Sequence, residues 1–148
     1  MKPYVIFTKK GFAVMFSLVV CGLFLANEIY AVCNAPLNAQ NNADRLSFID
    51  SLGITVESNQ PQSKTVLIPE VFYEVYNDYN ALQQAAGYDL SLYKGCEVTI
   101  YSYDITPPQN YTGESVVNLI VYKDKIIGGD ISSTALGGYM LPLKQVIA

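Results

Sequence analysis

The stretch SVVNLIVYKDKIIGGDISS, residues 115–133, decides the fold of this 148-residue chain. On both sides of Lys123 and Asp124, apolar residues recur with the period of two that is typical of β-strands. The short polar break between the two runs predicts a tight turn between antiparallel strands. We therefore expect a hairpin in which residues 115–122 pair with residues 125–133.

An upstream run, CEVTIYSYDI at residues 96–105, shows the same alternation and is followed by the polar loop TPPQNYTGE. Together with the hairpin, this run predicts a small antiparallel sheet of three strands. ITVE (residues 54–57) and KTVLIP (residues 64–69) alternate in the same way, and each predicts a further short strand.

Two helices are expected between these strands and before them. The segment PEVFYEVYNDYNALQQAAG, residues 69–87, is amphipathic and ends at Gly87. Its apolar side consists of Phe72, Val75, Tyr76, Tyr79, Leu82, Gln83 and Ala86. A shorter helix is predicted over ADRLSFIDSLG, residues 43–53, with Asn42 as its cap. The fold class is therefore α+β, a small antiparallel sheet with one long amphipathic helix packed on a face.

The first 34 residues predict a targeting segment. Three lysines precede the apolar run GFAVMFSLVVCGLFLA, residues 11–26, which is slightly shorter than the ~20 residues of a membrane-spanning helix. This segment is either an uncleaved hydrophobic anchor or a cleaved signal peptide. Both alternatives place the N-terminus inside and the rest of the chain outside the cell membrane, or secreted after cleavage. We expect residues 35–42 to be a tether and residues 43–148 to be one extracytoplasmic domain.

Composition excludes several functions. Residues 35–148 contain six basic and twelve acidic residues, a net charge of −6, so we expect no nucleic-acid partner. The chain contains no histidine, which excludes Ser-His-Asp and Cys-His catalysis and histidine-ligated zinc. An acidic row of Glu70, Glu74 and Asp78 on one helix face cannot surround a cation. We expect neither a metal nor another cofactor.

Three segments of the chain resemble a known family. GITVE, the block IPEVFYEVYNDYNALQQAAGYDLSLYKG and NLIVYKDKIIGGDISSTALGGYM are similar to the clostridial family of domain of unknown function 4830. The resemblance covers residues 46–140 and implies a Gram-positive, anaerobic source and a membrane-anchored or secreted protein. It supplies no catalytic residues. Relatives carry Asp-Gly at the hairpin turn, where this chain has Lys123-Asp124-Lys125, and glycine would adopt positive φ more easily.

The glycine pair in the second half of the hairpin has two interpretations. Gly128 and Gly129 follow strand residues and no helix follows them, so they do not form a phosphate-binding loop. They permit either a bulge or the close approach of a helix, with nearby hydroxyls bonding to the backbone. Alternatively, they border a cleft for a small ligand or a partner beside Asp130, Ser133 and Thr134.

Tyrosine is unusually frequent, with twelve residues and no tryptophan. Tyr101 and Tyr103 share one face of a predicted strand. If the long helix covers the other face, these two rings form a half-exposed aromatic surface that can bind sugars, peptides or proteins. The alternative is that tyrosine simply suits strands that face water.

The function expected from these observations is that of a non-catalytic protein-interaction module outside the cell, with the N-terminal segment in the membrane. The alternative is a small-ligand or cell-wall-glycan binding domain that uses the Tyr101 and Tyr103 face. We do not expect an enzyme, because no spacing singles out a pair among Asp104, Glu114 and Asp130 for hydrolysis.

Overall fold

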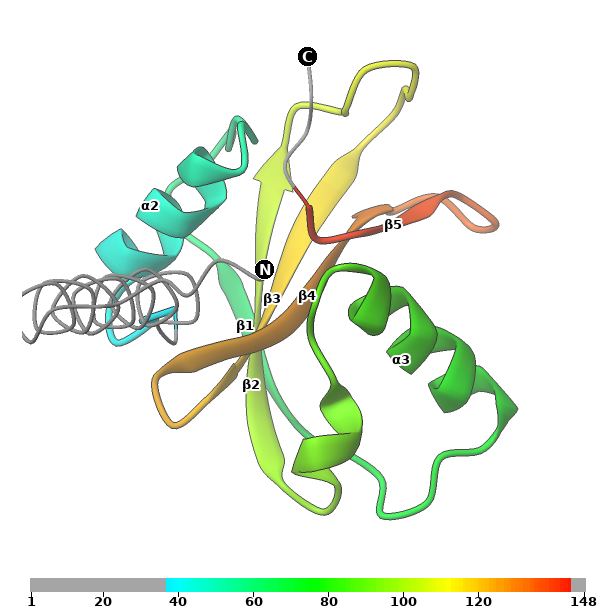
Figure 1. Cartoon of the computed structure of the whole chain (residues 1–148). Coiled ribbons are helices and arrows are strands. Elements are labelled where there is room, and N and C mark those ends of the chain that lie inside the picture. Colours follow the sequence, from blue (N-terminus) through cyan, green and yellow to red (C-terminus); the bar gives the residue numbers. More distant parts are fainter. Residues whose placement is uncertain (1–36, 145–148) are drawn as a thin grey trace, which may run out of the picture. The chain divides into compact units, whose positions relative to one another are not determined.

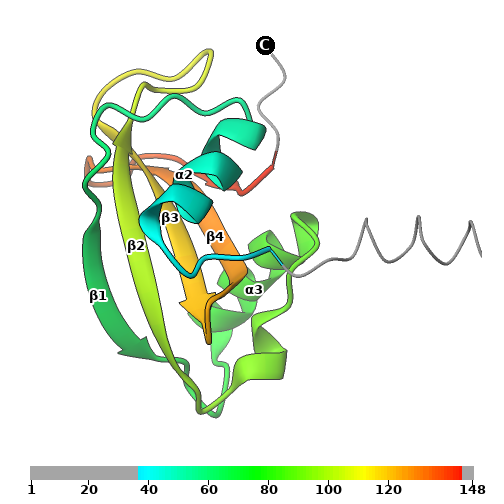
Figure 2. The same ribbon diagram turned by 90° about the vertical axis from the view of Figure 1, so that its left-hand side faces the viewer.

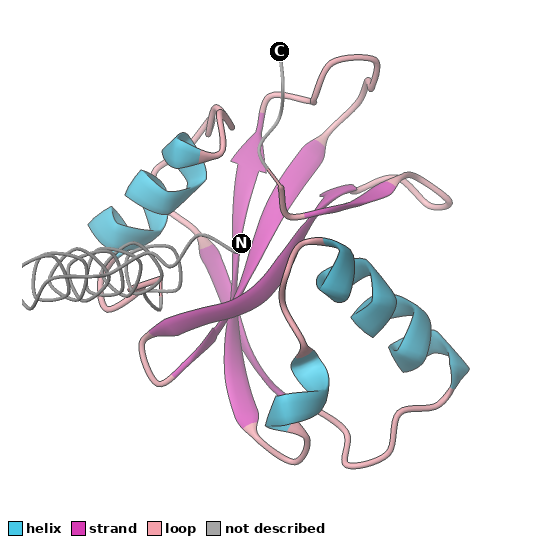
Figure 3. Cartoon of the chain, viewed as in Figure 1, coloured by secondary structure: helices cyan, strands magenta, loops and turns pink. Residues whose placement is uncertain are grey.

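Five strands form one antiparallel sheet in the computed structural model, which describes residues 37–144 (Figure 1). In chain order they are β1 (Gln62–Leu67), β2 (Glu97–Ile105), β3 (Ser115–Tyr122), β4 (Lys125–Ser133) and β5 (Met140–Pro142). Helix α2 (Asn42–Ser51) precedes the sheet, and helix α3 (Glu74–Ala85) and the 3₁₀ helix η1 (Leu90–Tyr93) connect β1 to β2 (Figure 3). The predicted α+β class is confirmed. The sheet also includes β1, which corresponds to the predicted strand KTVLIP, and β5, which was not predicted.

The hairpin of β3 and β4 forms as predicted. Val117 pairs with Ile131 and Leu119 with Gly129, and the register shifts between Ile120 and Val121. Both turn residues adopt positive φ, 44° at Lys123 and 62° at Asp124, the backbone that a two-residue hairpin requires. The hairpin therefore contains both the tight turn and a bulge beside the glycines.

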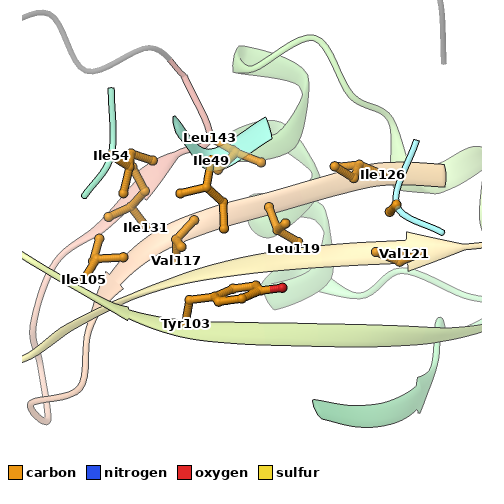
Figure 4. Packing of buried hydrophobic residues seen from close by; sticks show 11 residues of the cluster. Ile49, Ile54, Tyr103, Ile105, Val117, Leu119, Val121, Ile126, Ile131 and Leu143 are labelled. Carbon is orange, nitrogen blue, oxygen red and sulfur yellow. The ribbon is translucent and has the colours of Figure 1, made fainter. Parts of the chain in front are cut away.

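Buried hydrophobic clusters lie on both faces of the sheet. Helices α2 and α3 lie on opposite sides of the sheet (Figure 2). Side chains alternate along each strand, so one set packs on the α2 side and the other on the side of α3 and η1. The α2 side holds Ile49, Tyr103, Ile105, Val117, Leu119 and Ile131 (Figure 4). The other side holds Ile68, Leu90, Val98, Ile120 and Ile127. The sequence assigned a helix to one face only, and the structure adds α2 on the second face.

Two predicted elements are shorter than expected. ITVE contributes only an isolated bridge, Val56 to Ile105, because β1 occupies the edge of β2 as far as Ser102. Helix α3 begins at Glu74, and its cap residue Tyr73 makes no side-chain hydrogen bond. Upstream of it, the backbone of Ile68 still bonds to Cys96 and Gly95. Glu70 therefore lies outside the helix, and the predicted acidic row is not formed.

The predicted tether is ordered where the structure describes it. Ala39 is only 2% exposed, and its backbone N–H donates to the Asp124 carbonyl over 2.9 Å. Asn41, and not Asn42, caps α2, because its Oδ1 accepts the Asp44 N–H over 2.9 Å. Residues 1–34, predicted to be an anchor or signal, lie outside the described residues. Among residues 37–144, no helix is both long and apolar enough to cross a bilayer.

The domain boundary can be tested with two truncations. We expect residues 37–148 to fold, because Leu37–Ala148 forms one compact unit. A chain that starts at Asn42 loses the Asn41 cap, the Ala39 packing and the Ala39 carbonyl that accepts from Arg45 Nη1. Its melting temperature should fall by about 8 °C or more. Thermal unfolding followed by circular dichroism measures both chains, and equal midpoints would contradict this boundary.

Candidate functional site

A groove of about 680 Å³ lies between helix α3 and the sheet face opposite α2, and we call it the α3 groove. It forms because α3 packs on β4, β5 and η1, which leaves this face of β1, β2 and β3 without a covering helix. The sheet lines it with Val66, Val98, Ile100 and Ile120, and the helix with Val75, Tyr76, Tyr79 and Leu82. The lining is mainly apolar.

The position of α3 follows from where its polar side chains bond. In its C-terminal half, Gln83 Oε1 accepts the Gly129 N–H over 2.8 Å, and Asn80 Oδ1 accepts the Leu90 N–H over 2.8 Å. These bonds hold that half against β4 and η1. The first turn of the helix has no such contact, and Val75 remains 78% exposed at the groove.

Exposed apolar side chains surround the groove. Leu67 of β1 is 62% exposed, Tyr76 of α3 is 41% exposed and Met140 of β5 is 49% exposed, and all three line it. A concave surface with clustered exposed apolar groups is typical of binding sites. The predicted apolar face of α3 is thus only partly used for packing.

A polar network reaches the groove from the sheet. The Asp130 side chain is 3% exposed, and its Oδ1 accepts the Tyr79 hydroxyl over 2.7 Å. Its Oδ2 accepts from Asn118 Nδ2 over 2.9 Å, and Asn118 Oδ1 accepts the Ser102 hydroxyl over 2.6 Å. Burial and the negative charge of Asp130 hold the pKa of Tyr79 well above its usual range. Tyr79 is therefore a neutral hydrogen-bond donor.

The two adjacent glycines of β4 are required by packing. A Cβ atom on Gly128 would lie 2.7 Å from Gln83 Oε1, and one on Gly129 would lie 2.2 Å from the Asn118 carbonyl oxygen. Neither glycine has φ in the left-handed region. The interpretation that the pair permits a bulge and the close approach of a helix is confirmed.

The structure does not bring the three polar residues of the predicted cleft together. Asp130 contributes to the α3 groove, whereas Ser133 lies on the opposite face of the same strand, as the alternation of β4 requires. Ser133 Oγ accepts the Ala135 N–H over 3.1 Å, and Thr134 bonds to Glu114. The predicted cleft beside Asp130, Ser133 and Thr134 is therefore corrected to the α3 groove, which includes only Asp130.

The predicted aromatic surface is wrong at Tyr103, whose side chain is 0% exposed (Figure 4). Its hydroxyl accepts from Arg45 Nε over 2.9 Å and donates to Asn42 Oδ1 over 2.8 Å. The Arg45 guanidinium also lies 3.8 Å from the centre of the Tyr101 ring. Helix α2 supplies both polar partners and covers the face that was expected to be half exposed.

Asn118 and Tyr79 are members of the site that sequence reasoning missed. Asn118 interrupts the apolar run SVVNLIVY, and a polar residue inside a buried strand is a usable signal. The helical period places Tyr79 on the apolar side of the helix, and nothing in its spacing indicates a bond to Asp130. Within the described part of the chain, no group of three acidic or cysteine side chains could hold a metal ion.

Comparison with known protein families identifies the family of this chain. The model of a domain of unknown function, DUF4830, matches residues 48–131, which is more than half of the chain. The match includes β1, α3, β2, β3 and every groove residue named above except Met140. No curated protein and no solved structure shows significant similarity to the chain. The chain belongs to the DUF4830 family of domains of unknown function.

Proposed function

We propose that this domain is a non-catalytic binding module that holds an apolar segment of a partner protein in the α3 groove. The observation that carries the proposal is the partly uncovered groove, whose wall and rim include exposed Val75, Tyr76, Leu67 and Met140. Covering these side chains removes apolar surface from water, at ~25 cal/mol per Å². A bound segment would therefore cover the part of the sheet face that α3 leaves exposed.

A partner segment fits the groove better than a compact molecule does, because apolar side chains from β1, α3 and β5 stand exposed around it. One extended peptide can reach several of these elements, as in other groove-binding domains. The volume of about 680 Å³ also lies in the range of small-ligand sites, which supports a small apolar ligand as the second candidate.

We also propose that the module acts outside the cell, either anchored at the membrane or secreted. Three lysines before an apolar run of 16 residues support this location, because such a pattern directs the following chain across the membrane. The acidic composition of residues 35–148 makes a nucleic-acid partner unfavourable.

The proposal is tested by selecting heptapeptides from a randomised displayed library with the full chain. Selected peptides should bind at least about tenfold more weakly to Val75→Asp, which places a charge on the apolar wall. Val71→Asp is the matched control, because Val71 is 57% exposed and lies outside the groove. Isothermal titration calorimetry measures both variants.

Two outcomes would contradict a peptide-binding groove. One is that no peptide is enriched above the background of an unrelated protein. The other is that selected peptides bind to Val75→Asp and Val71→Asp equally well. The neutral dye Nile red tests the second candidate. A site for a small apolar ligand would bind the dye even if no peptide is enriched, and Val75→Asp would abolish this binding.

A further inference from the structure

We infer that the segment bound in the α3 groove presents a lysine or arginine to Asp130, with apolar residues on either side of it. This inference rests on the proposed function and specifies the chemistry of the partner. It follows from a buried carboxylate at a binding groove, whose partners among residues 37–144 are the neutral donors Tyr79 and Asn118.

Asp130 has unused hydrogen-bonding capacity. From the described part of the chain its oxygens accept one hydrogen bond each, from Tyr79 and from Asn118, whereas an ionised carboxylate offers about four lone-pair sites. Tyr79, Asn118 and Asp130 all line the groove, so a group bound there lies beside these three side chains. A lysine ammonium or an arginine guanidinium supplies donors for the remaining sites.

The charge around Asp130 favours a cation as well. Burial of a carboxylate is costly unless an opposite charge lies nearby, and neither Tyr79 nor Asn118 provides one. The groove has a second acid, Asp78, and Lys64 on β1 is the only basic residue that lines it within the described part of the chain. The net charge of −6 on residues 35–148 also attracts a basic partner.

The apolar lining selects which cations fit. Lysine and arginine have apolar stems that can lie along Val98, Ile100 and Ile120 while the charged end reaches a polar group. A hydrated inorganic cation has no such stem and gains nothing from the apolar walls. Apolar neighbours in the peptide would cover Val75 and Tyr76. The expected motif is thus one basic residue between apolar residues, and a uniformly basic stretch does not fit it.

The test uses the peptides selected by the full chain. The enriched sequences should share one lysine or arginine flanked by apolar residues, and replacing that residue by methionine should weaken binding at least about tenfold. Exchange of lysine for arginine should retain most of the affinity. These comparisons change only the peptide, so they do not depend on the stability of a variant protein.

The protein side of the test is Asp130→Asn, with the exposed Asp50→Asn on α2 as the matched control. In Asp130→Asn the lysine and methionine peptides should bind within about threefold of each other, whereas Asp50→Asn should keep the full difference. If Asp130→Asn does not fold, the peptide comparison on the unchanged chain decides.

Two failures can be told apart. Peptides that bind in the groove without a basic residue, or a lysine preference that survives in Asp130→Asn, overturn this inference and leave the proposed function standing. A library from which no peptide is enriched overturns both.

Discussion

Replacing Gly129 by alanine should lower the free energy of unfolding by about 3 kcal/mol or more. The added Cβ would lie 2.2 Å from the Asn118 carbonyl oxygen and 2.7 Å from Leu143 Cδ2. The first of these atoms belongs to the backbone of the central strand β3, so the sheet itself would have to move. Urea denaturation of the variant and the unchanged chain measures the difference.

Gly128→Ala is the matched control, because Gly128 is the neighbouring glycine on the other face of β4. Its added Cβ would meet Gln83 Oε1 at 2.7 Å and Leu90 Cδ2 at 3.2 Å, and both atoms end flexible side chains. The expected loss is smaller, about 1–2 kcal/mol. A Gly129→Ala variant as stable as the unchanged chain would contradict the register between β3 and β4.

Tyr103→Ala should lower the free energy of unfolding by about 3–5 kcal/mol, because it removes a fully buried aromatic ring from the α2 side of the sheet. Tyr103→Phe should cost about 1–3 kcal/mol, because it keeps the ring and leaves Arg45 Nε and Asn42 Oδ1 without the hydroxyl. Denaturant titration of both variants checks these values.

Tyr101→Phe is the matched control, since the Tyr101 ring that lies under Arg45 is retained. We expect a change of less than about 0.5 kcal/mol. If Tyr103→Phe were neutral, and Tyr103→Ala reduced peptide binding without loss of stability, Tyr103 would be a binding residue and the α2 side would not be the core that we describe.

Much of the fold could be predicted because its elements are encoded locally. The period of two in residues 115–133 defines β3 and β4, and two polar residues define their turn. Gly87, predicted to end the long helix, adopts φ of 89° after α3. The steric need for small residues at the glycine pair was also visible, although which atoms approach them was not.

The location of the site could not be predicted in the same way, because it depends on which element covers which face. The sequence predicts helix α2, but it does not predict which strand the helix contacts. Arg45 and Asn42 bond to Tyr103, which lies 58 and 61 residues further along the chain. The helical periodicity of the sequence likewise places Val75 and Gln83 on one face of the helix. It does not show that Gln83 is buried and that Val75 remains open.

The most direct test of the α3 groove is an amide NMR titration of the isotope-labelled full chain with a selected peptide. We predict that the shifted amide signals concentrate in residues 64–68, 75–82, 98–100 and 118–120, and that Asp130→Asn reduces these shifts. Signals that move only in α2 or in residues 106–113, on the other side of the sheet or at its end, would contradict the assignment of this groove as the functional site.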